Sequence, residues 1–355
     1  MKVLVLNSSP RGAGQSKTEL MLNYLTRGMR EAGAEVEVVA LREKTIKNCI
    51  GCFTCWTRTP GVCVHQDDMT NDLFPKWLES DLVVYGTPLY NYGVTATMKA
   101  FWERTIPYLL PFFEIRDGRM FHPTRGKSPA VVVLSVAGMP DEGHFGPLSA
   151  HMKYTYASRG RKLVAEIYRP AAEMLPSPFL KEKANDVLEA TAEAGRELVQ
   201  SMEISPETMK RITQPLVDPQ FFATMANVMW KTCIAEGVTP KEFDAKKMIP
   251  RPDSIDSFLL LFPFGINAKA VGDRKTVVQF TFSGEVEGAC YFTIEKGTVN
   301  AQKGTWDGAD LTIETPFSVW MDIMTGKADG RQMLMEQKYR VSGDLPLMMQ
   351  LFAKA

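Results

Sequence analysis

The 355-residue sequence lacks net charge, a membrane-spanning run and an export signal. Its 41 Lys and Arg residues balance 41 Asp and Glu residues, which argues against a nucleic-acid partner because nucleic-acid-binding proteins carry a basic surface. The longest apolar candidate, residues 258–264, falls well short of the roughly 18 residues of a membrane span and contains Pro263. Met1 and Lys2 lead directly into a strand-like apolar run. We therefore expect a cytoplasmic protein without a transmembrane segment.

The sequence also has little cysteine, and four of its six cysteines lie close together. The group follows the pattern Cys-x2-Cys-x2-Cys-x7-Cys and consists of Cys49, Cys52, Cys55 and Cys63. A disulfide framework would spread its cysteines, so this spacing predicts a metal-binding or redox-active loop. Four thiols at such intervals suit an iron-sulfur cluster or a zinc ion. Structural thiols, a disulfide or an empty site are the alternatives.

Histidine is scarcer still, with four residues in the chain. His65 lies near Cys63 and is a candidate substitute for one of the metal ligands, although an exposed loop histidine without a ligand role is the favoured interpretation. The other three show no metal-ligand spacing and are assigned no role; they are His122, His144 and His151.

The hydrophobic pattern predicts two domains, since the chain is more than twice the roughly 150 residues of a typical one. In residues 1–202, apolar runs alternate with helix-period segments, which favours an α/β fold with a parallel sheet. The expected strands are residues 2–7, 35–41, 82–86, 130–136 and 163–168, and the expected helices are residues 16–32, 70–79, 93–104, 145–158 and 177–202. This is a flavodoxin-like, doubly wound, five-stranded sheet of order 2-1-3-4-5. Its ligand crevice is expected at the carboxyl ends of strands 1 and 3.

The pattern changes after about residue 205. Residues 203–253 are expected to form a helical connector, with one long helix over residues 206–236 and then a Lys- and Pro-rich segment. Residues 254–355 are expected to form an α+β domain with a largely antiparallel sheet. Its strands are predicted at residues 276–283, 289–295, 298–303 and 310–314, and its helices at residues 254–270, 317–325 and 345–354.

The loop after the first strand, residues 7–18, is suited to holding an anion. The start of the following helix offers free N–H groups and the positive end of the helix dipole. Arg11 and Lys17 add positive charge, and Ser9, Ser16 and Thr18 add hydroxyl donors. Ser16 stands where a Walker A loop requires glycine before the lysine, and no G-x-G-x-x-G motif is present. The alternative interpretation is a tight turn with a serine cap.

The segment after the third strand, residues 86–93, is expected to face this loop across the crevice. Its aromatic rings and backbone groups suit an isoalloxazine, which needs a stacking surface and hydrogen bonds at its edge. A plain turn that packs on the core is the alternative.

These motifs resemble the NADPH-dependent FMN reductase family, especially its iron-sulfur flavoproteins. The resemblance covers residues 1–200 and rests on Asn-Ser-Ser-Pro-Arg at 7–11, Gly-Cys at 51–52, Cys-Trp at 55–56, Asp-Asp-Met at 67–69 and Gly-Thr-Pro-Leu-Tyr at 86–90. It implies FMN as cofactor, NAD(P)H as substrate and a four-iron four-sulfur cluster on the four cysteines. That loop leaves the carboxyl end of strand 2, on the edge expected to hold the flavin. The FMN contacts that it implies are Ser9, Arg11, Gly14, Gln15, Ser16, Lys17, Thr18, Pro88, Leu89, Tyr90, Asn91, Tyr92, Gly93, Ala137 and Gly138.

Residues 255–355 resemble the sterol-carrier-protein type 2 family of lipid-binding domains. The resemblance rests on the turn at 304–310, the strand at 311–313, the helix start at 317–320 and the segment Val-Ser-Gly-Asp at 341–344. It implies an apolar tunnel for a fatty-acyl or sterol-like lipid. The expected pocket residues are Trp306, Phe317, Trp320, Met321, Met324 and Met348, although each methionine taken alone also fits an ordinary core position.

The expected function is that of an FMN-dependent NAD(P)H oxidoreductase that passes electrons to a quinone, flavin or iron-sulfur acceptor. We expect no catalytic acid or base, because flavin chemistry needs mainly placement and electronic tuning from the protein. One alternative is an electron-transfer flavoprotein with a ferredoxin-like donor, and another is a lipid carrier or sensor with a regulatory flavin domain. We also expect a homo-oligomer.

Overall fold

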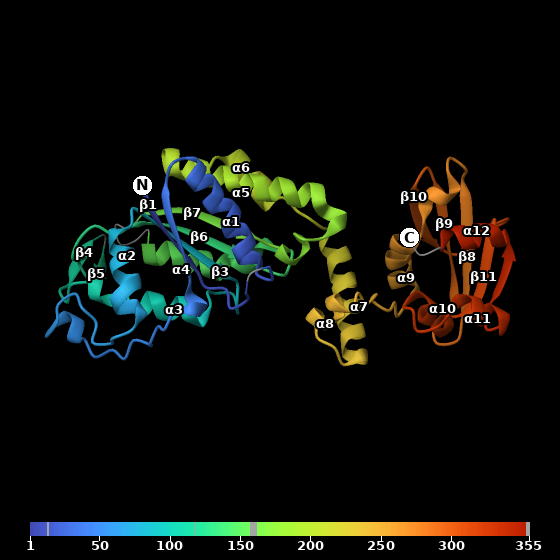
Figure 1. The fold of residues 1–355 in the computed structure, drawn as a ribbon, viewed down its shortest axis with the longest axis horizontal. Helices are drawn as coiled ribbons and strands as arrows, with labels where there is room; N and C mark the ends of the chain where they lie inside the picture. The colour runs from blue at the N-terminus through green and yellow to red at the C-terminus, as the bar shows by residue number, and fades with distance from the viewer. Residues whose placement is uncertain (13, 117, 157–161, 353–355) are drawn as a thin grey trace. The chain divides into compact units, whose positions relative to one another are not determined.

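The structure, a computed structural model, describes residues 1–12, 14–116, 118–156 and 162–352. The chain divides into two compact units, Met1–Val217 and Asp218–Ala355 (Figure 1). Their boundary falls inside the predicted connector. No helix in the described ranges is long and apolar enough to cross a membrane.

Unit 1 is built on a five-stranded sheet of order β2-β1-β3-β6-β7, in which every neighbouring pair is parallel. The strands are β1 (Lys2–Asn7), β2 (Glu35–Ala40), β3 (Leu82–Pro88), β6 (Ala130–Val136) and β7 (Leu163–Arg169). The central strands are runs of Val and Leu that are buried on both faces, as a parallel sheet covered by two helix layers requires. The predicted doubly wound fold and its strand order are confirmed.

Two helix layers cover this sheet. One layer contains α1 (Lys17–Glu31), α5 (Lys181–Ser201) and α6 (Pro206–Thr213), and the other contains α2 (Phe74–Glu79), α3 (Ala96–Glu103) and α4 (Gly146–Tyr156). A π-helical turn, Met69–Leu73, replaces the first half of the helix predicted at 70–79. The last two residues of the helix predicted at 145–158 lie outside the described residues. A short antiparallel hairpin, β4 (Glu114–Arg116) with β5 (Arg119–Phe121), was not predicted.

Short 3-10 helices complete unit 1, at Leu41–Glu43, Thr54–Trp56, Ile106–Tyr108, Glu142–Phe145, Ala172–Met174 and Pro178–Leu180.

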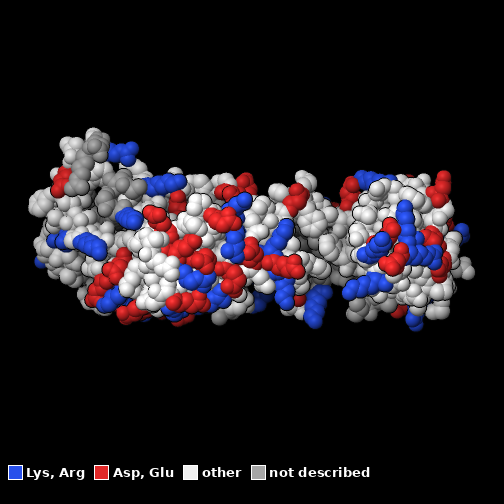
Figure 2. Space-filling view, turned by 90° about the horizontal axis from the view of Figure 1, so that it is seen from above, with Lys and Arg blue, Asp and Glu red and all other residues white. Residues whose placement is uncertain are grey.

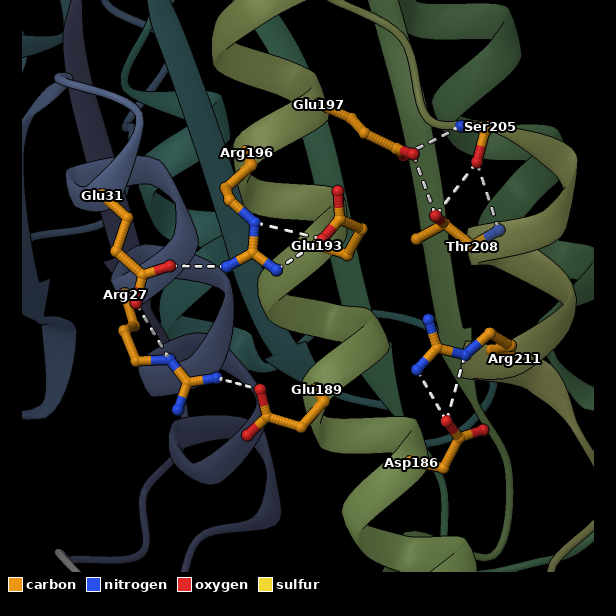
Figure 3. Close-up of polar contacts among 10 residues, drawn as sticks. All are labelled: Arg27, Glu31, Asp186, Glu189, Glu193, Arg196, Glu197, Ser205, Thr208 and Arg211. Atoms are coloured by element: carbon orange, nitrogen blue, oxygen red, sulfur yellow. Dashed lines mark hydrogen bonds and ion pairs between the residues drawn. The ribbon is translucent and has the colours of Figure 1, made fainter.

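Helices α1 and α5 approach each other closely because each carries a glycine at the contact. A Cβ atom added to Gly28 would lie 1.8 Å from the Ala192 carbonyl oxygen, and one on Gly195 would lie 2.1 Å from that of Leu25. Ion pairs flank this contact, including Arg27 with Glu189 (Figure 3). Acidic and basic side chains are largely interspersed over the part of unit 1 that faces the viewer in Figure 2, as such pairing requires.

Helix α6 belongs to unit 1 because it is bonded to both α5 and β7. Figure 3 shows Glu197 of α5 at the start of α6 and Arg211 of α6 on Asp186 of α5. The buried guanidinium of Arg169, at the end of β7, donates to the carbonyl oxygens of Ile212 at 2.6 Å and of residue 214 at 2.8 Å. A positive charge at a helix carboxyl end is favourable because it meets the unpaired carbonyls there.

Unit 2 contains a second five-stranded sheet, of order β10-β9-β8-β11-β12. Only β8 and β11 pair in parallel, so the predicted α+β class with a largely antiparallel sheet is confirmed. The elements are α7 (Pro219–Glu236), α8 (Pro240–Ala245), α9 (Ile255–Leu261), 3-10 helices Phe262–Gly265 and Ala268–Val271, β8 (Thr276–Ser283), β9 (Gly288–Glu295), β10 (Thr298–Lys303), β11 (Leu311–Pro316), α10 (Phe317–Met324), α11 (Gly330–Met335), β12 (Arg340–Gly343) and α12 (Leu345–Leu351).

Two predicted helices were wrong in extent. The helix predicted at 206–236 is two helices, because Pro215 interrupts it and Asp218 caps a new start by accepting from the Phe221 N–H. The helix predicted at 254–270 stops at Leu261, and two 3-10 helices follow around Pro263. Helix α11 and strand β12 were not predicted. The end of the helix predicted at 345–354 lies outside the described residues.

These contacts predict where a stable flavin-domain fragment ends. A fragment of residues 1–217 should unfold cooperatively, whereas a fragment of residues 1–202 should melt about 10–15 °C lower. The shorter fragment loses the buried Ile212 and two carbonyl acceptors of the buried Arg169, which together are worth on the order of 4–5 kcal/mol. Thermal unfolding followed by circular dichroism measures the difference. Equal melting temperatures would show that α6 is not part of the folding unit.

Candidate functional site

The loops at the carboxyl ends of β1, β3, β6 and β7 are joined to one another by the backbone. The donor–acceptor pairs, each N–H to carbonyl oxygen at 2.8–3.0 Å, are Ser8 to Gly86, Leu89 to Val136, Ala137 to Arg169 and Ala171 to Met139. The three segments predicted to contact a flavin therefore meet at one edge of the sheet, as the order of the parallel strands requires.

The first loop leads directly into α1. Ser16 is the N-cap of α1, and its hydroxyl accepts from the Glu19 N–H at 3.0 Å. The hydroxyl of Ser9 accepts from the Arg11 N–H at 3.3 Å, and Gly14 adopts a left-handed φ of 79° that a side chain would strain. The loop closes with a 3.2 Å bond from the Gln15 N–H to the carbonyl of residue 12. Ala13 lies outside the described residues.

The polar side chains of this loop differ in exposure. Ser9, Ser16 and Thr18 are buried, whereas the side chain of Arg11 is half exposed. Lys17 is mostly buried, and its ammonium group donates to the Gln15 carbonyl at 3.4 Å. The buried hydroxyls thus fix the shape of the loop, and the two cations present charge at its rim.

Both cations face one carboxylate, that of Glu173. Arg11 Nη1 lies 2.7 Å from Glu173 Oε1, and Lys17 Nζ lies 3.5 Å from Oε2. The hydrogen bond that Arg11 donates to Glu173 raises the pKa of Arg11 above its ordinary value. Glu173 was not predicted as a site residue, and no sequence signal marks it, because it lies 162 positions after Arg11. Its carboxylate is the anionic group that both cations contact at this loop.

The second loop is a tight two-residue turn. Tyr90 and Gly93 exchange both backbone hydrogen bonds at 3.0 Å, and Asn91 and Tyr92 have left-handed φ values of 47° and 61°. Two positive φ values are the mark of a type I′ turn, and they are strained at tyrosine. The rings of Tyr90 and Tyr92 are exposed, whereas Pro88 and Leu89 are half-buried. This turn explains why α3 begins at Ala96 and not at residue 93.

The third loop joins the other two. Ala137 both donates to Arg169 and accepts from Ala172, so Ala137 and Gly138 lie against the segment that carries Glu173. At the end of β6, the hydroxyl of Ser135 is buried and has no hydrogen-bond partner among the described residues. His144, to which the sequence assigned no role, lies 5.6 Å from the ring of Tyr92.

The four clustered cysteines border one small cavity of about 20 Å³. Cys55 is buried, Cys52 is exposed, and none of the six cysteines forms a disulfide. Burial raises the pKa of the Cys55 thiol, and the nearby Cys63, Cys52 and Cys49 raise it further. Within the described ranges, no three His, Cys, Asp or Glu side chains have the arrangement needed to hold a metal ion. Four thiols are the donor set that an iron-sulfur cluster takes. In this structure, however, the thiols are not in ligating positions.

His65 borders the same cavity and is half-buried rather than exposed, so the exposed-loop interpretation was wrong. Its Nε2 atom is buried and has no hydrogen-bond partner in the described part of the chain.

A buried ion pair fastens the cysteine loop. Arg104 binds both carboxylate oxygens of Asp67, at 2.8 and 3.0 Å, and also donates to the Lys47 carbonyl at 2.7 Å and the Thr70 hydroxyl at 2.8 Å. Burial would raise the pKa of Asp67, but the bonds from Arg104, Lys47 and Thr70 outweigh it and hold that pKa well below its usual range. The pair ties the two ends of the loop together.

The cysteine loop lies away from the three segments predicted to contact a flavin. Its cavity includes Ile106, and Trp56 Nε1 donates to the Ile106 carbonyl at 3.2 Å, so the cysteines lie beyond the end of α3. The second loop, at residues 90–93, lies before the start of α3, and this eight-residue helix is about 12 Å long. The loop leaves the carboxyl edge of the sheet as expected, but Arg104 draws it back along α3.

In unit 2 the predicted lipid-pocket residues divide between two faces of the sheet. Phe317, Trp320, Met321 and Met348 are buried in one core, with Met324 packed against it. Trp306 lies 5.2 Å from the ring of Tyr291 on the opposite face and is 37% exposed. The core is filled by aromatic rings in mutual contact, including Phe258, Phe262, Phe280, Phe292 and Trp320.

Both units match known families. Residues 1–148 match the NADPH-dependent FMN reductase family, and residues 267–353 match the SCP-2 sterol transfer family. Both resemblances seen in the sequence are thereby confirmed.

The curated relatives described next match part of the chain. An iron-sulfur flavoprotein of Archaeoglobus fulgidus is 35% identical over 144 residues, which are 40% of this chain and 58% of that protein. An iron-sulfur flavoprotein of Methanocaldococcus jannaschii is 32% identical over 120 residues, 34% of this chain and again 58% of the relative. An FMN-dependent NADH:quinone oxidoreductase of Pseudoalteromonas atlantica is 26% identical over 190 residues, 50% of this chain and 76% of the relative. The chain thus spans just under three fifths of the two archaeal proteins.

Among solved structures, an NAD(P)H:quinone oxidoreductase from Methanothermobacter marburgensis aligns with a TM-score of 0.43 and 20% identity, covering 56% of this chain and 96% of that one.

Proposed function

We propose that this protein is an FMN-dependent NAD(P)H oxidoreductase whose flavin binds at the carboxyl edge of the unit 1 sheet. The observation that carries the proposal is the pair of cations at the start of α1, Arg11 and Lys17, which already hold a carboxylate. A helix start with two cations and a serine cap suits a terminal phosphate. The match of residues 1–148 to the FMN reductase family supports FMN as the ligand.

Each loop has a separate task in this proposal. The first loop binds the phosphate through Arg11, Lys17 and its backbone. The exposed tyrosine turn at residues 90–93 offers the isoalloxazine a stacking surface. Bound FMN supplies hydride acceptance and onward electron transfer. The residues of the chain place it and shield it.

We propose a quinone, a flavin or an iron centre as the electron acceptor. The family of residues 1–148 and the quinone oxidoreductase relative support a reductase that uses NAD(P)H. The iron-sulfur flavoprotein relatives support the alternative, an electron-transfer protein with a ferredoxin-like donor. We also propose a homo-oligomer in the cytoplasm.

The purified protein should release FMN and no FAD on heating, because the loop is sized for one terminal phosphate. Arg11→Ala should weaken FMN binding about tenfold, since it removes a charge-assisted hydrogen bond. Arg27→Ala is the matched control, because Arg27 is an arginine of similar exposure that pairs with Glu189 away from the crevice. Titration of the apoprotein with FMN, followed by flavin fluorescence, measures both affinities.

FAD as the sole flavin would contradict the assignment, as would equal FMN affinities in the two variants. Anaerobic stopped flow then separates the two redox roles. Rapid bleaching of the bound flavin by NADPH supports the reductase, and bleaching only by a reduced ferredoxin supports the electron-transfer protein.

We further propose that the cysteine loop holds an iron-sulfur cluster on Cys49, Cys52, Cys55 and Cys63. Support comes from the single cavity that these thiols border and from the names of the archaeal relatives. Small movements of this loop, which Asp67 and Arg104 fasten at its ends, would bring the thiols into ligating positions. The cluster would supply one-electron transfer.

Protein prepared without oxygen should contain about four iron and four acid-labile sulfide per chain, as expected for a four-iron cluster on four thiolates. Cys49→Ser should lose most of this iron, and Cys233→Ser, at a buried cysteine of unit 2, should keep it. Asp67→Asn should keep the ligands but lose iron faster to a chelator, because the loop ends separate. A tightly bound zinc ion, or no iron after anaerobic reconstitution, would contradict the cluster.

For unit 2 we propose an apolar ligand of the fatty-acyl or sterol class, on the support of its match to the SCP-2 sterol transfer family. The aromatic rings of this core are in mutual contact, so an acyl chain that enters between them has to part rings such as Phe262. Affinity should therefore reflect both the gain from burying methylenes and the cost of parting these rings.

Affinity for saturated fatty acids should rise with chain length, by at most about fourfold per methylene, because each buried methylene contributes roughly 0.8 kcal/mol. Phe262→Ala should bind more tightly, since it removes a ring from the core. Ile234→Ala, at an exposed position of unit 2, should not change binding. Displacement of a fluorescent acyl probe from the full-length protein measures the series. Binding that is independent of chain length would contradict a lipid pocket.

A further inference from the structure

The carboxylate of Glu173 occupies the charge position that the proposed function gives to the flavin phosphate. Its two oxygens contact two different cations, Arg11 at 2.7 Å and Lys17 at 3.5 Å. A phosphate group that binds this loop needs the same two cations. Glu173 and the phosphate therefore compete for one pair of partners.

The backbone holds Glu173 in this place. Ala171 adopts a left-handed φ of 49°, unusual for alanine, and donates to the Met139 carbonyl at 2.8 Å. Ala172 donates to the Ala137 carbonyl at 2.9 Å, and a Cβ atom on Gly138 would lie 3.9 Å from the Glu173 Cγ. The residue is thus fixed to the third loop while its side chain reaches the first.

The exposure of the pair makes it exchangeable. The side chains of Arg11 and Glu173 are 51% and 48% exposed, and ion pairs of that kind contribute only about 0.2–1 kcal/mol. A phosphate monoester carries about −1.5 to −2 charges at pH 7. When a phosphate binds, the two cations can release Glu173, and the stabilisation from that ion pair is then lost. If the cations instead remain paired with Glu173, its carboxylate lies beside the phosphate and repels it. Both outcomes weaken phosphate binding.

We propose that Glu173 is an internal counter-anion that competes with the flavin phosphate for Arg11 and Lys17 and makes bound FMN exchangeable. The inference rests on the proposed function and deepens it, because it names Glu173 as the residue that raises the dissociation rate of bound FMN. Glu173 weakens the binding of the phosphate group of the ligand and has no effect on the isoalloxazine. Riboflavin, which has no phosphate, is not affected.

The test compares Glu173→Gln with wild type in the full-length apoprotein. The amide keeps the size of the side chain and removes its charge, so FMN should bind about twofold to fivefold more tightly and dissociate correspondingly more slowly. Riboflavin affinity should not change. Glu189→Gln is the matched control, because Glu189 pairs with Arg27 at 2.6 Å with similar exposure but away from the crevice.

Two further measurements separate competition from a merely structural role. In an Arg11→Gln background, Glu173→Gln should have a much smaller effect on FMN affinity, since one of its two partners is gone. The difference between wild type and Glu173→Gln should shrink at high ionic strength, where exposed charges are screened. Thermal unfolding checks that each variant folds.

The outcomes are distinct. Tighter FMN binding by Glu173→Gln, with riboflavin unchanged, supports the inference. Unchanged or weaker FMN binding by this variant, while wild type binds FMN, overturns it and leaves the proposed function intact. Equal tightening of riboflavin overturns it too, since the effect would not act through the phosphate. If wild type binds no FMN, the proposed function fails, and the inference fails with it.

Discussion

The candidate site depends on the parallel pairing of β1, β3, β6 and β7. Because these strands run in one direction, all four loops leave from the same edge, and backbone hydrogen bonds then join each loop to its neighbour. The amide and carbonyl groups that link the loops are satisfied by one another, which leaves the side chains free for a ligand. A flavin that lies in the crevice needs three surfaces at once, and this edge supplies them without a long insertion.

The end of β7 contacts several of the elements that form this edge of the sheet. Burial lowers the pKa of the Arg169 guanidinium to about 10. The group donates to the carbonyl oxygen of Pro170 and to those of Ile212 and Gln214 at the end of α6. Its backbone carbonyl accepts from Ala137 of the third loop. The next residues carry Glu173 to the first loop. One short segment therefore sets the position of α6, of the third loop and of the carboxylate that faces the first loop.

Much of this fold could be predicted from the sequence, because apolar runs and helix-period segments alternate in unit 1. The strands at Lys2–Asn7 and Ala130–Val136 were predicted to the residue. The features that could not be predicted depend on pairs far apart in the chain. Arg104 and Asp67 are 37 positions apart, and their pairing folds the cysteine loop back along α3. The left-handed Ala171, which directs Glu173, has no signal in the sequence because alanine rarely adopts that conformation.

Two of the ion pairs of unit 1, Asp67 with Arg104 and Arg11 with Glu173, differ in how easily they open, and burial decides the difference. The side chains of Asp67 and Arg104 are 0% and 1% exposed, and breaking a buried pair of this kind costs about 3–5 kcal/mol. That is a large part of the 5–15 kcal/mol that stabilises a typical domain, so this pair remains closed as long as the unit is folded. The half-exposed pair of Arg11 and Glu173 costs little to open, because water solvates both groups. The same chemistry therefore serves as a permanent fastening at the cysteine loop and as an exchangeable contact at the flavin edge.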